Sequence, residues 1–135
     1  MSGLTIWTLD WVPDGPRGFV RDLRLRWACE EAGLTYEVRT VPFEGRETNH
    51  LERQPFGQVP AIETPELKLF ESGAIVLYIA ERSPALAPAD ADGQARVKAW
   101  AFAAASAKIA ATKDNPRPIP TMFPWCSALS RLVEK

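Results

Sequence analysis

The opening order of strand, helix and strand restricts the fold of this chain more than any other feature. Leu4–Leu9 is β-branched and aromatic and predicts a strand, while Phe19–Ala32 carries apolar side chains at helical spacing. Gly33 suits a helix C-cap, and Thr35–Phe43 predicts a second strand. Two strands connected by one helix are normally parallel, with a right-handed crossover. We therefore expect the chain to begin with a parallel pair of strands covered by a helix.

The residues after this unit predict an antiparallel hairpin and a further helix. The polar stretch "EGRETNHLER" has weak helical periodicity, enough for one or two turns. Val59–Thr64 and Leu67–Phe70 read as short strands joined by the turn-forming pair "PE". A helix should then begin at Glu71 or Ser72 and end before Pro84. The expected order is β-α-β-α-β-β-α, an α/β fold with a mixed four-stranded sheet and helices on its faces.

The rest of the chain predicts a partial helical region. Residues 1–84 form the expected α/β domain, and 85–93, rich in Pro and Asp, form a linker. Within 94–135, the alanine-rich segment Gln94–Ala111 predicts a helix. Beyond Lys113 the prolines are too closely spaced for a helix, so we expect an irregular tail.

Composition limits the classes of partner. The chain has 135 residues, of which 46% are hydrophobic and 24% charged, and a net charge of -1. These values are typical of one globular domain without the basic surface that nucleic acids or acidic membranes attract. The N-terminus does not have the basic and apolar regions of a secretory signal peptide. No apolar run reaches the roughly 18 residues that a membrane-spanning helix needs. We expect a cytoplasmic protein with no nucleic-acid or membrane partner.

The cysteines and the histidine offer little chemistry. Cys29 and Cys126 are far apart and form no C-x-x-C pair, so we expect neither a disulfide framework nor dithiol exchange. Cys29 lies inside the first helix beside Glu30 and Glu31, which disfavours a thiolate. With His50 as the only histidine, and in a polar segment, we expect a surface role for it and no metal site.

Pro60 is unusual because it falls at the start of the predicted core strand, in "QPFGQVPAIE". Proline lacks the N–H that a central strand donates. A cis Val59–Pro60 bond would turn the backbone of Val59 outward, where it could pair with an extended peptide. An ordinary trans proline at the start of a strand is the alternative, and the pattern alone leaves both open.

Glu71 and Ser72, in "FESGAI", lie where a strand passes into a helix. The free N–H groups of a helix N-terminus and the serine hydroxyl could bind a carboxylate, and the glutamate could accept hydrogen bonds from an ammonium. A carboxylate and an ammonium on one carbon make an amino-acid head group. The alternative is plain helix capping by Ser72.

Taken together, "QPFGQVPAIE…LKLFESGAIVLYIAE" and "RDLRLRWACEEAGLTYE" resemble the glutathione transferases, specifically their thioredoxin-like N-terminal domain. The resemblance extends from about Leu4 to Trp100. It implies a thioredoxin-like fold, glutathione as co-substrate, a small electrophile as second substrate, and a homodimer. It implies no metal.

The same resemblance assigns binding roles to five residues. Val59 would offer its backbone to the cysteinyl part of glutathione, ahead of a cis Pro60. Glu71 and Ser72 would hold the γ-glutamyl head, and Gln58 would lie beside the tripeptide.

The resemblance leaves the catalytic residue unassigned. Family members place a Tyr, Ser or Cys after the first strand or at the start of the first helix, but "DWVPDGPRGFVRD" contains none of these. Arg17 and Arg21 are the only charged donors there, and Thr8 is the nearest hydroxyl. A solvated helix face is the simpler interpretation of both arginines.

The C-terminal part also departs from the family, whose long helical domain covers the first helix. We expect a truncated or frame-shifted member, with a natural short variant as the alternative. Val20, Leu23 and Trp27 would then lose their usual cover, and each large side chain left exposed forfeits roughly 1.5–3 kcal/mol. The Gln94–Ala111 helix or self-association would replace part of that cover.

Three functions follow from these expectations. The first is a transferase that conjugates the glutathione thiol to small electrophiles, as in detoxification. The second is a glutathione-binding or protein-interaction domain without catalysis, which the missing hydroxyl or thiol favours. The third is a fragment that binds nothing well.

Overall fold

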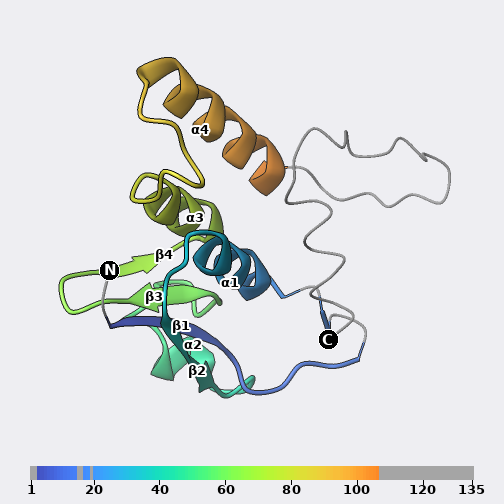
Figure 1. The fold of residues 1–135 in the computed structure, drawn as a ribbon. Helices are drawn as coiled ribbons and strands as arrows, with labels where there is room; N and C mark the ends of the chain where they lie inside the picture. The colour runs from blue at the N-terminus through green and yellow to red at the C-terminus, as the bar shows by residue number, and fades with distance from the viewer. Residues whose placement is uncertain (1–2, 15–16, 19, 107–135) are drawn as a thin grey trace, which may run out of the picture. The chain divides into compact units, whose positions relative to one another are not determined.

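The computed structural model describes residues 3–14, 17–18 and 20–106 of the chain (Figure 1). Its elements follow the predicted order, and the helix expected after the linker is present as the last of them. They are β1 (Leu4–Leu9), α1 (Asp22–Glu31), β2 (Tyr36–Val41), α2 (Arg46–Asn49), β3 (Ala61–Glu63), β4 (Lys68–Phe70), α3 (Ser72–Ala80) and α4 (Ala91–Ser106).

The strands form one mixed sheet in the order β2-β1-β3-β4. β1 and β2 are parallel, in register from Leu4 opposite Tyr36 to Leu9 opposite Val41. β3 is antiparallel to β1, and β4 is antiparallel to β3. The predicted α/β fold with a mixed four-stranded sheet is therefore confirmed.

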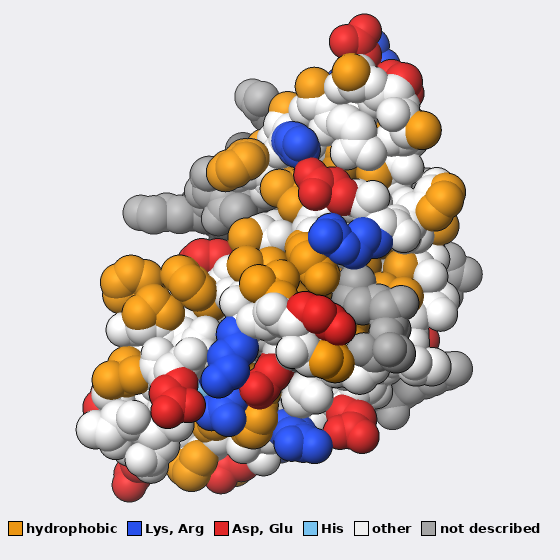
Figure 2. All heavy atoms as spheres, turned by 90° about the vertical axis from the view of Figure 1, so that its left-hand side faces the viewer, with side chains coloured by type: hydrophobic (Ala, Val, Ile, Leu, Met, Phe, Trp, Pro, Cys, Tyr) orange, Lys and Arg blue, Asp and Glu red, His pale blue; other side chains and the backbone are white. Residues whose placement is uncertain are grey.

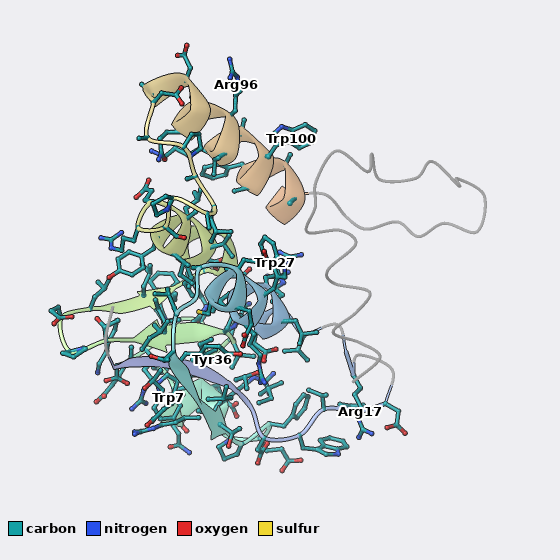
Figure 3. All side chains as sticks on the ribbon, viewed as in Figure 1. Trp7, Arg17, Trp27, Tyr36, Arg96 and Trp100 are labelled. Atoms are coloured by element: carbon teal, nitrogen blue, oxygen red, sulfur yellow. The ribbon has the colours of Figure 1, made fainter. Side chains whose placement is uncertain are left out.

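The helices cover both faces of the sheet, with α1 and α3 on one face and α2 on the other (Figure 1). Alternation along β1 sends Leu4 and Ile6 toward α1 and α3, while Trp7 lies on the α2 side (Figure 3). The side chains buried between the sheet and α1 and α3 form the core. They are Leu4, Ile6, Leu25, Ala28, Cys29, Ile62, Ile75 and Ile79.

Prolines and caps set the boundaries that the sequence placed only approximately. β2 ends at Val41, just before Pro42, and β3 begins only after Pro60, since neither proline can donate to a sheet. α4 begins at Ala91, before the expected start, because the carboxylate of Asp90 accepts a hydrogen bond from the N–H of Gly93 at 2.7 Å. The expected continuation of this helix to Ala111 and the irregular tail lie outside the described residues.

Beyond its first turns, α4 is mostly exposed, and one ion pair joins it to the end of α3. The Nζ of Lys98 lies 3.2 Å from a carboxylate oxygen of Glu81. Such a partly exposed pair contributes at most about 1 kcal/mol. No helix among the described residues is long and apolar enough to cross a membrane.

The surface carries both signs of charge side by side. Figure 2 shows the side of the molecule that lies at the left of Figure 1, and basic and acidic side chains are neighbours over its lower half. Hydrophobic side chains gather between them and above them on this face. The face therefore offers no broad region of one sign that would attract a polyelectrolyte.

Burial makes Cys29 a structural residue, as its sequence position indicated. The side chain is fully buried in the core beneath α1. Burial raises the pKa of the Cys29 thiol to about 11, and the charge of Glu30 contributes in the same direction. A thiol with that pKa is almost entirely protonated at neutral pH, so it is a poor nucleophile.

Two leucines provide a matched test of the core. We expect Leu25→Ala to lower the free energy of unfolding by about 2–5 kcal/mol, because Leu25 is fully buried. Leu51 is 45% exposed, so Leu51→Ala should cost less than about 1 kcal/mol. Urea denaturation of both variants measures the difference, and equal losses would contradict this core.

The protection of Cys29 is tested by thiol labelling in a Cys126→Ser background, where Cys29 is the only cysteine left. At neutral pH we expect the native chain to react at least about a hundredfold more slowly than the urea-unfolded chain, because of burial and the raised pKa. A native rate close to the unfolded rate would show that the core around α1 is open.

Candidate functional site

One small pocket gathers the residues that the sequence singled out. Its lining comes from the residue before α1, the loop that leads into β3, and the first residues of α3. The lining residues are Arg21, Gln54, Gln58, Val59, Pro60, Glu71 and Ser72. All five predicted binding residues therefore lie together, with Arg21 and Gln54 added. The enclosed space is only about 10 Å³, so a tripeptide could lie across these residues but not inside the pocket.

The loop between α2 and β3 is held by the side chain of Gln54, which is 1% exposed. Its Oε1 accepts hydrogen bonds from the N–H of Phe56 at 2.6 Å and from the N–H of Gln58 at 3.1 Å. Gly57 has a φ of +61°, and a Cβ there would lie 3.0 Å from the Cα of Glu47 in α2. Only glycine allows this approach without strain.

The peptide bond between Val59 and Pro60 is cis, in agreement with the expectation. Neither the N–H nor the C=O of Val59 forms a hydrogen bond with another described residue. Backbone N–H and C=O groups in a folded protein are almost always paired with a partner. Val59 is half-buried and lines the pocket, so its unpaired N–H and C=O are available to a ligand. An extended peptide is the ligand that such a backbone segment suits.

Glu71 has a backbone conformation that is unusual for a side-chain-bearing residue. Its φ is 69° and its ψ is 112°, the one positive φ outside glycine in the part of the chain that the structure describes. Residues held in such conformations cost about 1–3 kcal/mol and cluster at functional sites. This conformation joins β4 directly to α3.

The plain-capping interpretation of this segment is wrong. Glu71, and not Ser72, is the N-cap of α3, and its carboxylate makes no capping hydrogen bond. Ser72 is the first residue of the helix and is buried. Ser72, the first residue of α3, and the exposed Glu71 before it thus both line the pocket.

His50 is not a surface residue, so that prediction is wrong. It ends α2 and is fully buried, with its ring 6.5 Å from the ring of Trp7. Neither ring nitrogen has a hydrogen-bond partner among the described residues. Burial lowers the pKa of His50, the charge of Arg53 lowers it further, and the backbone carbonyl of Gln58 acts in the opposite direction. His50 is therefore neutral in the native state at neutral pH.

A charged cluster holds the α2 side of the sheet next to His50. The guanidinium of Arg53 lies over the Trp7 ring at 4.0 Å, and its Nε is 3.3 Å from Oε2 of Glu63. The Trp7 indole donates to the same oxygen at 3.1 Å. Burial raises the pKa of Glu63, but the hydrogen bonds from Arg53 and Trp7 and the charges of Arg53 and Lys68 outweigh it and lower the pKa. The cluster anchors the segment that continues into the Gln54 loop.

A larger cleft of about 250 Å³ lies between the loop after β1 and α1. Its lining is Thr8, Leu9, Asp10, Trp11, Val12, Arg17, Gly18, Val20, Asp22, Leu23 and Arg26. Thr8 is buried and faces this cleft, not the pocket of Glu71. Among the described residues no group of three or more His, Cys, Asp or Glu could hold a metal ion.

Comparisons with known proteins match this arrangement. Residues 15–81 fit the family model described as the N-terminal domain of glutathione S-transferase. Glutathione S-transferase 1 of Zea mays is 46% identical over 63 residues, which are 44% of this chain and 29% of that protein. The chain belongs to the glutathione transferase family.

Two further comparisons extend this result. The glutathione S-transferase-like protein gedE of Aspergillus terreus is 32% identical over 126 residues, which are 83% of this chain and 53% of that protein. The crystal structure of the theta class glutathione S-transferase from Xanthomonas axonopodis pv. citri, with glutathione bound, is 33% identical with a TM-score of 0.57. That match covers 70% of this chain and 44% of the other. The chain thus spans at most about half the length of these relatives.

Burial of neutral His50 predicts a pH-dependent stability. In the unfolded chain this histidine takes up a proton below its ordinary pKa of about 6.5, whereas the native chain does not. The free energy of unfolding should therefore fall as the pH drops below about 6.5, by at most about 1.4 kcal/mol per pH unit.

Because the chain has one histidine, His50→Phe removes this source of pH dependence between about pH 7.5 and 5.5. Urea denaturation across that range measures it for both proteins. Parallel pH profiles for the wild type and His50→Phe would show that His50 is not held neutral.

Proposed function

We propose that the chain binds glutathione at the pocket of Pro60 and Glu71 and transfers its thiol to small electrophiles. The observation that carries the proposal is the convergence of residues 58–60 and 71–72 on one pocket. The glutathione bound in the Xanthomonas relative supports the choice of tripeptide.

The chemistry of the pocket fits the parts of glutathione. The free N–H and C=O of Val59 suit the backbone of the cysteinyl residue, in the manner of an added strand. The N-terminal N–H groups of α3 and the Ser72 hydroxyl suit the α-carboxylate of the γ-glutamyl head. The exposed carboxylate of Glu71 suits its ammonium group, and Gln58 lies alongside.

The reaction has a simple balance. The thiol of glutathione loses its proton to water or buffer, and the sulfur electron pair forms a bond to an electrophilic carbon. In a substitution, the leaving group departs with the pair of the bond that breaks. In an addition, a proton from solvent completes the neighbouring atom. The chain's part is to bind the tripeptide and favour the thiolate.

A non-catalytic glutathione-binding domain is the second candidate. Two observations favour it. Residues 10–22 contain no Ser, Thr, Cys or Tyr, and the chain matches only 29% and 53% of the length of the two curated relatives. Turnover of an aromatic halide or an enone with glutathione separates the two, since a binding domain gives no rate above buffer. A cytoplasmic location and a homodimer also stay predictions.

Thermal unfolding with millimolar glutathione tests the binding site. Ligand that binds only the native state at 100-fold excess over its dissociation constant stabilises by about 2.7 kcal/mol, so the midpoint should rise. We expect Glu71→Gln to abolish most of this rise, because the ammonium loses its carboxylate partner.

Glu66→Gln is the matched control, since Glu66 is exposed in the turn between β3 and β4 and outside the pocket. It should keep the full rise. A cooperative transition that glutathione does not shift in the wild-type chain would sink the proposal, and no cooperative transition would favour the non-functional fragment.

A further inference from the structure

We propose that Arg21 is the group that stabilises the glutathione thiolate in this chain. This inference rests on the proposed function and names its missing catalytic residue. Sequence reasoning could not choose between Arg17 and Arg21, and it favoured a solvated surface for both. The structure separates the two arginines.

Arg21 reaches the right pocket. It is the N-cap of α1, with φ -65° and ψ -13°, and it lines the same pocket as Val59, Glu71 and Ser72. It is the only cationic residue in that lining. A cysteinyl residue paired with the backbone of Val59 would therefore lie beside a pocket that has Arg21 as its one cationic lining residue.

Among the residues that the structure describes, the side chain of Arg21 forms no ion pair. It forms no side-chain hydrogen bond with any of these residues either. The adjacent carboxylate, Asp22, is buried and committed to Arg26, whose Nη2 lies 2.8 Å away. Four other arginines of the described residues pair with carboxylates, namely Arg17, Arg26, Arg39 and Arg53, but none of these four lines this pocket.

The other candidates for the role are placed elsewhere. Arg17 pairs with Asp14 at 3.2 Å and lines the larger cleft, and Figure 3 shows it on the loop after β1, well away from α3. Thr8 lines the same larger cleft. Cys29 is enclosed in the core. Ser72 does line the pocket, but it lies at the start of α3, where the proposed function uses it for the head group.

The physical effect is the ordinary one of a cation on a thiol. A thiol with a pKa near 8.5 ionises more readily beside a positive charge and a helix N-terminus, and Arg21 precedes the first turn of α1. Arginine keeps its own proton, so it acts as a fixed charge and not as a base. The thiol proton goes to solvent, and the thiolate is held ready for the electrophile.

The test measures thiol ionisation separately from binding. Ultraviolet absorbance of the thiolate, recorded against pH for glutathione bound to the full chain, gives the pKa of the bound thiol. Thermal stabilisation by S-methylglutathione, which has no thiol, reports binding alone. The variants are Arg21→Gln and Arg21→Lys, with Arg17→Gln as the matched control.

In the wild type, we expect the bound thiol to ionise at lower pH than free glutathione. Arg21→Gln should reduce the thiolate fraction at neutral pH about tenfold, equivalent to a rise of about one pKa unit. Arg21→Lys should restore most of it, and Arg17→Gln should not change it. Stabilisation by S-methylglutathione should be the same in all four proteins.

Three outcomes would overturn the inference. Unchanged thiol ionisation in Arg21→Gln would show that another group stabilises the thiolate. Loss of S-methylglutathione binding in that variant would make Arg21 a ligand of the tripeptide's carboxylates. If the wild-type chain is stabilised by neither glutathione nor S-methylglutathione, the proposed function itself fails, which the first two outcomes leave intact.

Discussion

The side-chain amide of Gln54 is the interaction on which the site depends. One buried oxygen accepts two backbone N–H groups and thereby fixes the turn between α2 and β3. With the turn fixed from inside, Val59 presents its own N–H and C=O to the pocket. Each of these two hydrogen bonds contributes about 0.5–1.5 kcal/mol. A single amide thus defines the local shape from which the backbone recognition follows.

The pocket also has a consistent electrostatic character. It lies where α1 and α3 both begin, and helix N-termini carry partial positive charge. Arg21 adds a full charge, and Glu71 is the one carboxylate in the lining. Such a site suits a ligand with several anionic groups and one ammonium. Glutathione, with two carboxylates, one ammonium and an ionisable thiol, has that pattern.

Much of the fold could be predicted from the sequence, because periodicity reports which face of an element is buried. The order of strands and helices came from such local signals. The grouping of Val59, Pro60, Glu71 and Ser72 was instead implied by the resemblance to the glutathione transferases. His50 could not be placed, because its neighbours in sequence are polar and its burial comes from Trp7 on a distant strand. Separating Arg21 from Arg17 likewise requires the path of the loop in space, which no local pattern records.

The backbone of Glu71 has a consequence for anyone who would engineer this domain. Glycine is the residue that adopts a φ near 69° without steric cost, so a search for stability alone would replace the glutamate there. The resulting protein would be more stable and would lack the one carboxylate among the residues that line the pocket. Stability and ligand binding therefore favour different amino acids at position 71. Selection for stability alone would remove the glutamate from the binding site.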